Sequence, residues 1–234
     1  MIVKAETTPG MERAMARAEE YGWKQVAAAT VYASFGEIVG NAEPMFALLK
    51  NGLLVRQASD EVVQMIQLSA LKGAAYGFRW GVSLGFVPHE WSPRPRFHRT
   101  LKSARLDLWE EPFNFLITDH FTGQGWDYLV ETMHGEPCMR RDMQAAWSKL
   151  QPVINSFFNS LDSLEGVLQK TTEHATRSWR SFRHHPDPKM VQAFTLARLG
   201  RLPEAEGLLS ALMAESELFE SPQELLAALR KTPN

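Results

Sequence analysis

The stretch Tyr76–Phe86 constrains the fold more than any other part of the sequence. Large apolar residues alternate there with small or polar ones: Tyr76, Phe78, Trp80, Val82, Leu84 and Phe86 against Gly77, Arg79, Gly81, Ser83 and Gly85. A helix would scatter the apolar side chains around its axis and would carry interior glycines at about 1 kcal/mol each. A strand places all of them on one face. We therefore expect an extended, half-buried strand whose apolar face is the centre of the core.

Other segments with period two predict the rest of the sheet. They are Leu54–Gln57, Val62–Ala70, Ala104–Trp109 and Phe113–Thr118. Turns as short as the one at Ser59-Asp60 join antiparallel strands, and no regular alternation of strands with helices appears. The sequence predicts an α+β fold with an antiparallel sheet of four to five strands.

Helices are predicted before the sheet. Thr8-Pro9 is typical of a helix start and Gly22 of a helix end. A second helical stretch covers residues 24–39, and a short third helix passes through residues 46–49. We expect this third helix to end at Asn51-Gly52.

The last part of the chain is predicted to be helical from Met139 onward. Pro152 should kink or restart the first of these helices, and Asp187-Pro188 is a typical start of another. The residues 193–212 describe a helical hairpin, and Ser221-Pro222 opens a last helix. We expect one part at residues 1–135, with helices in 8–50 and the sheet in 53–118. A helical segment at 139–234 should pack on the same core.

Composition places the chain among ordinary globular proteins of a reducing compartment. Of its 234 residues 44% are hydrophobic and 22% are charged, and the net charge is −2, so bulk charge predicts no attraction to nucleic acid or membranes. Cys138 is the only cysteine, which excludes an intrachain disulfide. No signal-like or membrane-spanning apolar run occurs. These features favour the cytoplasm.

Two segments resemble known families. The order "LLKNGLLVRQ", "EVVQMIQLSALKG" and "YGFRWGVSLGFVP" within residues 44–109 resembles a bacterial family catalogued as domain of unknown function 4304. The resemblance implies a small α+β fold and no known activity, and some relatives belong with immunity-type proteins that neutralise toxins by binding them. The segment "AFTLARLGRLPEAEGLLSAL" looks like half of a tetratricopeptide array, although a stable stack needs at least three repeats.

The run Gly81-Val82-Ser83-Leu84-Gly85 matches the G-x-S-x-G pattern of a nucleophile elbow. An elbow needs the serine on a sharp strand-to-helix turn. Here the alternation continues past the serine and Pro88 follows, so we favour a strand. The face with Gly81, Arg79 and Ser83 is then either a shallow binding floor or a close packing surface.

Metal and cofactor chemistry finds little support. Glu131 and His134 have the spacing of carboxylate-bridged metal sites, but the second copy that such sites need is absent. Pro137 argues against a common helix for His134 and Cys138. We predict no metal and no cofactor.

Charged residues cluster in three places. One basic run contains Arg94, Arg96, Arg99, Lys102 and Arg105, and a second contains Arg177, Arg180 and Arg183. One acidic segment contains Glu204, Glu206, Glu215, Glu217, Glu220 and Glu224. These runs are either solvated faces or contacts for an anion, a nucleic acid or a basic protein.

We expect a non-enzymatic protein-binding module, possibly immunity-like in the sense of the resemblance. Its predicted binding residues are Arg79, Ser83, Arg94, Arg96, Arg99, Glu215, Glu217 and Glu220. The alternative is a hydrolase or nucleic-acid-processing enzyme with a site built from Arg79, His98, Arg99, Asp119 and His120. That alternative requires these groups to converge in one pocket.

Overall fold

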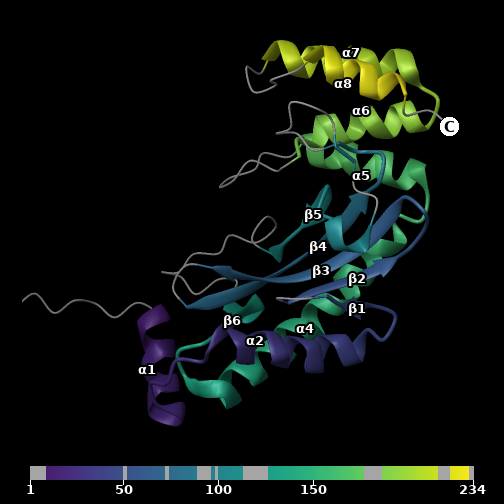
Figure 1. Ribbon diagram of the computed structural model, residues 1–234. Coiled ribbons are helices and arrows are strands. Elements are labelled where there is room, and N and C mark those ends of the chain that lie inside the picture. Colours follow the sequence, from purple (N-terminus) through teal and green to yellow (C-terminus); the bar gives the residue numbers. More distant parts are fainter. Residues whose placement is uncertain are drawn as a thin grey trace, which may run out of the picture. The chain divides into compact units, whose positions relative to one another are not determined.

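The computed structural model describes residues 9–49, 52–71, 74–88, 96–97, 100–112, 126–176, 186–215 and 222–231. Its elements are, in chain order (Figure 1), α1 (Pro9–Tyr21), α2 (Ala28–Phe35), the π-helical turn η1 (Gly36–Gly40), β1 (Ala47–Leu48), β2 (Leu53–Gln57), β3 (Val62–Leu71), β4 (Ala75–Leu84), η2 (Leu101–Ser103), β5 (Leu108–Glu110), η3 (Trp126–Tyr128), β6 (Leu129–Glu131), α4 (Gly135–Asn159), α5 (Leu164–Thr176), α6 (Pro188–Arg198), α7 (Leu202–Glu215) and α8 (Pro222–Arg230).

The strands form one antiparallel sheet. Their order is β1-β2-β3-β4-β5, and β6 pairs with β4. Ala47 lies opposite Val55 in the β1–β2 pair, and Tyr76 lies opposite Val130 in the β4–β6 pair. The prediction of an α+β fold with an antiparallel sheet is confirmed, with six strands among the described residues. The predicted strand Phe113–Thr118 lies outside those residues.

The chain divides into two compact units, and the boundaries between them fall inside several strands and one helix. The first consists of Met1–Val55, Ile66–Trp80 and Glu110–Ile154, and the second of Arg56–Met65, Gly81–Trp109 and Asn155–Asn234. The strands β2, β3 and β4 and the helix α4 therefore contribute residues to both units.

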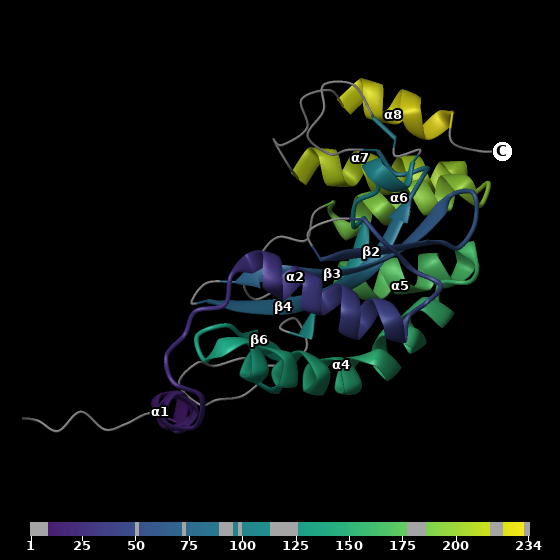
Figure 2. The same ribbon diagram turned by 60° about the horizontal axis from the view of Figure 1, so that its bottom comes forward.

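The core of the first unit is built around the apolar face of β4. Phe78 of this strand lies 6.1 Å from the ring of Phe35 on α2 and 6.0 Å from Trp147 on α4, measured between ring centroids. All three rings are buried. Figure 2 shows α2 and α4 running side by side along the strands. The strand that the alternation predicts is thus the element on which both helices pack.

The second unit contains the C-terminal helices. α6 packs against α5 and α7, and α8 contacts α7 and α6 (Figure 1). The carboxylate of Asp187 accepts a hydrogen bond of 2.8 Å from the amide of Lys189, which confirms the predicted helix start. Gly200 ends the first helix of the hairpin with a φ of 75°, a conformation that glycine adopts without strain. No helix in the described part is both long and apolar enough to cross a membrane.

The predicted helix through residues 46–49 is wrong. Residues 47–48 form the strand β1 instead, because β2 supplies backbone partners such as Leu53, whose carbonyl accepts from the amide of Leu49 at 2.9 Å. Of the two outcomes predicted at Pro152, a restart does not occur, because α4 continues through this residue to Asn159. Proline removes the hydrogen bond to the carbonyl four residues earlier. That carbonyl belongs to Ser148, an exposed residue, so water can replace the lost donor.

β5 packs closely on β4 at Gly81. A Cβ atom added to Gly81 would lie 2.3 Å from the carbonyl oxygen of Leu108 and 2.6 Å from Cβ of Trp109. At this residue the glycine-containing face of β4 is therefore a packing surface, and no room for a ligand exists there.

The first prediction concerns this close approach. We expect Gly81→Ala to lower the free energy of unfolding by about 1–3 kcal/mol, because the new methyl group has to displace backbone atoms. Gly207→Ala is the matched control: it lies inside α7 with no atom near the added Cβ, and should raise stability by about 0.5–1 kcal/mol. Urea unfolding followed by circular dichroism measures both. Equal effects of the two variants would contradict the packing argument.

Candidate functional site

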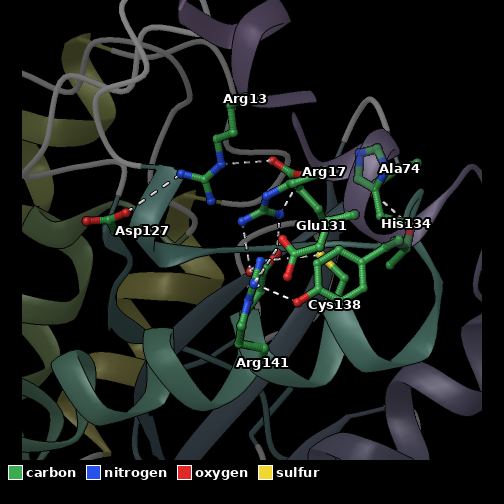
Figure 3. A network of polar contacts seen from close by, with 12 residues as sticks. Arg13, Arg17, Ala74, Asp127, Glu131, His134, Cys138 and Arg141 are labelled. Carbon is green, nitrogen blue, oxygen red and sulfur yellow. Dashed lines mark hydrogen bonds and ion pairs between the residues drawn. The ribbon is translucent and has the colours of Figure 1, made fainter. Parts of the chain in front are cut away.

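A buried arginine attaches α1 to the rest of the first unit. Arg17 is only 8% exposed, and its guanidinium donates to both carboxylate oxygens of Asp142 on α4, at 2.5 and 2.9 Å. It also donates to Glu131 on β6 at 2.7 Å. Figure 3 shows Arg13 one turn away on the same side of α1, with ion pairs of 3.7 Å to Asp127 and 3.8 Å to Glu131. The two arginines fix the side of α1 that faces inward.

The charges of this network favour its ionised form. Burial alone would lower the pKa of Arg17, but the hydrogen bond and the charge of Asp142, together with the charge of Glu131, outweigh it and raise that pKa. The guanidinium therefore stays protonated at every physiological pH. Because each member has an opposite charge as a neighbour, the arrangement is suited to hold a helix rather than to transfer a proton.

Cys138 and His134 belong to the same region but do not form a reactive pair. Cys138 is fully buried on α4, where burial and the charge of Asp142 raise the pKa of its thiol, so the neutral form prevails. Arg141 lies beside it, 3.7 Å from the sulfur, and donates to the hydroxyl of Tyr21 at 2.7 Å. His134 is buried just before α4 and approaches the carbonyl of Gly22 at 3.3 Å. Both residues serve packing in this geometry.

The outward side of α1 is apolar. Met11 and Met15, four residues apart, are 51% and 55% exposed, and Ala14 and Ala18 lie on the same face of the helix. We call these four residues the α1 stripe. Trp23, which follows the helix, is 64% exposed. The helix thus reverses the usual arrangement, in which the apolar stripe faces the core and charged residues face water.

Ser83 lies inside β4 and is buried. Its hydroxyl donates to Asp107 over 3.4 Å and accepts from the backbone amide of Arg105 at 3.3 Å. The strand ends one residue later in a turn, so the serine is not on a strand-to-helix elbow. The strand interpretation of the G-x-S-x-G run is confirmed. Its burial also leaves Ser83 no surface to offer to a binding partner.

Asp107 is a fully buried carboxylate beside Ser83. It accepts hydrogen bonds from the amide of Leu84 at 2.8 Å and from the Arg105 guanidinium at 2.9 Å. Burial raises the pKa of Asp107 from 3.8 to about 7, although the charge of Arg105 partly counteracts the effect. The native protein therefore holds a proton here that the unfolded chain releases at lower pH.

The structure describes only some of the other predicted site residues. Arg79 donates to Glu111 at 2.8 and 3.0 Å, and Arg96 is exposed. Glu204 and Glu206 of the acidic segment form ion pairs of 2.6 Å with Arg201 and Arg230, so that part of the segment is neutralised. The residues outside the described part are Arg94, His98, Arg99, Asp119, His120, Glu217 and Glu220, and the side chain of Glu215 is likewise not described. Convergence of the alternative enzyme site stays a prediction.

The described residues offer no group of metal ligands. In the described ranges, no three side chains of His, Cys, Asp or Glu are grouped so that they could hold a metal ion. Glu131 of the Glu-x-x-His pair is engaged by Arg17.

The second prediction tests the attachment of α1. Arg17→Met should accelerate hydrogen exchange of the α1 amides by about 100-fold, because Asp142 and Glu131 lose their buried counter-charge at a cost of about 3 kcal/mol. Arg141→Met is the control, since its exposed ion pairs contribute less than about 1 kcal/mol. Hydrogen–deuterium exchange with mass spectrometry resolves α1 from the sheet. Equal protection of α1 in the two variants would disprove the attachment.

The third prediction concerns Asp107 and pH. Because its pKa is raised in the native state, its contribution to stability is present below about pH 4 and is lost as pH rises to about 7. We expect Asp107→Asn to remove this decline, which amounts to at most about 4 kcal/mol. Urea unfolding at several pH values between 5 and 8 measures the difference between variant and wild type.

Asp127→Asn is the control for this titration. Its hydrogen bond from Lys149 lowers the pKa of Asp127, so its contribution is lost only at more acidic pH. The difference between this variant and wild type should stay constant over the measured range. Parallel pH profiles of wild type and Asp107→Asn would contradict the assignment.

Comparison with known proteins adds no relative to this geometry. No family model matches the chain, and neither the curated proteins nor the solved structures contain a match. The resemblance to the domain of unknown function 4304 family stays a prediction.

Proposed function

We propose that this chain is a non-enzymatic protein-binding module that acts by covering the surface of a partner protein. The observation that carries the proposal is the orientation of α1, which buries Arg17 and leaves Met11 and Met15 half exposed. Each exposed methionine leaves unrealised roughly 1 kcal/mol of hydrophobic stabilisation, about half of the value for complete burial of its side chain. A partner that covers the α1 stripe recovers this free energy.

The chemistry of the α1 stripe suits a protein partner. Methionine side chains are flexible and polarisable, so they adapt to the contours of an opposing surface. Residues four apart on a helix anchor it in the groove of a partner, and Met and Trp are enriched at the centres of interfaces. Met11 and Met15 supply this spacing, and the exposed Trp23 follows in the same stretch of chain.

The charges beside the α1 stripe select for a basic partner. Glu19 is exposed, lies four residues from Met15 and is its neighbour on the helix surface. The arginines of the helix, in contrast, turn inward. A second copy of the chain would bring glutamates against glutamates, whereas a partner with lysines or arginines around an apolar patch is complementary.

The resemblance to immunity-type proteins suggests a toxin as such a partner. A binding protein of that kind neutralises its target by occlusion and needs no reactive group of its own. The buried and hydrogen-bonded positions of Ser83 and the neutral thiol of Cys138 are compatible with this role. The alternative enzyme, with Arg79 at its site, gains no specific support, because the described partner of Arg79 is Glu111.

The fourth prediction tests the α1 stripe. A partner captured with the wild-type chain should bind Met11→Glu/Met15→Glu at least 30-fold more weakly, since removing central interface contacts costs about 2 kcal/mol or more. Binding is measured by isothermal titration calorimetry with both proteins purified. Affinity for the wild-type chain should also fall as salt is added, because the flanking carboxylate of Glu19 contributes.

Val153→Glu is the matched control. Val153 is an apolar residue of α4 that is 48% exposed and lies away from α1 in the sequence. This variant should bind as the wild type does, and circular dichroism should show that all variants are folded. Unchanged affinity of the double α1 variant would refute the proposal. So would sedimentation data in which the wild type dimerises and the double variant does not, since the stripe would then be a self-interface.

A further inference from the structure

The second unit contains a cavity of about 440 Å³ that is independent of the α1 stripe. Its walls come from the β2–β3 hairpin and from the turn between α4 and α5. All of its lining residues belong to this one unit. Cavities of this size hold small molecules rather than proteins, and they combine an apolar floor with a few directed polar groups.

The floor of the cavity is apolar and buried. It is formed by Val62 of β3, Phe158 at the end of α4, Leu161 in the turn and Val167 of α5. A ligand with an apolar side chain would release water from this floor on binding.

Gln64 is a directed polar group in the wall. It is only 6% exposed, and its amide oxygen accepts from two nitrogens of the Arg56 guanidinium, Nε at 2.8 Å and Nη2. Guanidinium groups only donate, so this contact fixes which end of the amide is the oxygen. The amide nitrogen of Gln64 donates to no group within the described residues. This nitrogen is not one of the fully buried polar atoms without a partner, so it reaches solvent, and a ligand in the cavity can replace water as its acceptor.

The first turn of α5 adds further donors. Ser163 caps this helix: its hydroxyl accepts from the amide of Gly166 at 3.1 Å, and its carbonyl accepts from Val167 at 3.0 Å. Over the ranges described, the amides of Leu164 and Glu165 donate to no protein acceptor. Unpaired amides at the positive end of a helix dipole favour a carboxylate or another anion. Leu164 and Gln64 both line the cavity, and each brings a donor without a protein acceptor among the described residues.

The cavity also carries acidic groups, which exclude a simple anion. Asp162 is exposed and has no ion pair in the part of the chain that the structure describes, and Glu61 is bound by Arg198 at 2.8 Å. A ligand with only a carboxylate would be repelled by Asp162, whereas a ligand that also carries an ammonium group would be attracted. Donors, acidic groups and an apolar floor in one cavity match a ligand with three corresponding parts.

We propose that this cavity binds a zwitterionic ligand, an apolar α-amino acid or a dipeptide with free ends. Its carboxylate accepts from Gln64 and from the first turn of α5, its ammonium group faces Asp162, and its side chain lies on the apolar floor. The cavity belongs to the second unit and the α1 stripe to the first, and neither proposal depends on the other.

The fifth prediction tests the ligand class with the full chain. Calorimetry should detect binding of L-leucine or leucyl-leucine at millimolar concentration or below. The ligand that binds more tightly shows whether the cavity takes a single amino acid or a dipeptide. Two analogues lack one charge each: 4-methylpentanoate has no ammonium group and 3-methylbutylamine has no carboxylate. Each should bind at least 10-fold more weakly than leucine, because one of the two polar contacts is lost.

Two variants separate the polar contacts. Gln64→Leu should weaken binding of the leading ligand at least 10-fold, and Gln144→Leu, on the exposed face of α4, should leave it unchanged. Asp162→Asn should weaken the binding of leucine but strengthen the binding of 4-methylpentanoate. Because Asp162 is exposed, this variant keeps the test valid if Gln64→Leu does not fold. The proposal is overturned if neither leucine nor the dipeptide binds. It is equally overturned if the amine alone binds as tightly as leucine and Asp162→Asn leaves the binding of both leucine and 4-methylpentanoate unchanged.

Discussion

Burial of the apolar face of β4 is the interaction on which the rest of the structure depends. Phe78 receives Phe35 from one helix and Trp147 from another, so α2 and α4 are positioned by the same strand. The residues on the opposite face of β4 are buried too, except Arg79, and at Gly81 the neighbouring strand β5 approaches so closely that any side chain would collide. A strand buried on both faces cannot carry a serine nucleophile to the surface. The G-x-S-x-G run is explained by packing: its glycine makes room for β5, and its serine bonds to a buried carboxylate.

The attachment of α1 follows a different principle from that of the core. Arg17 and its two carboxylate partners give directional contacts whose net free energy is small, because desolvation of the charges offsets much of their attraction. What such contacts determine is orientation, since an arginine fork fits a carboxylate in only a few geometries. Apolar contacts alone would have turned Met11 and Met15 inward. The polar contacts therefore account for the exposed stripe on which the proposed function rests.

The sequence allowed much of this fold to be predicted, and the failures have physical causes. The long strand Ala75–Leu84 and the capped start of α6 carry local signals, namely an alternation and an Asp-Pro pair. β1 and β6 have only two and three residues, too few to show a period, and they exist because a neighbouring strand offers backbone partners. The cavity lay beyond prediction for another reason: Gln64 and Leu164 are distant in the sequence, and only the tertiary structure brings them to one cavity.

The α1 stripe shows where prediction from the sequence ends and the tertiary structure is needed. A helical period identifies an apolar face, but it does not state whether that face meets the core or the solvent. The direction of the apolar face is decided by the arginines on the other side of the helix. Arg13 and Arg17 could have been taken for a solvated basic face, yet the carboxylates of Glu131 and Asp142 lie more than a hundred residues away in the sequence and draw them inward. Because Arg13 and Arg17 hold the helix from its other side, a change of the exposed Met15 side chain to suit a partner leaves those contacts in place.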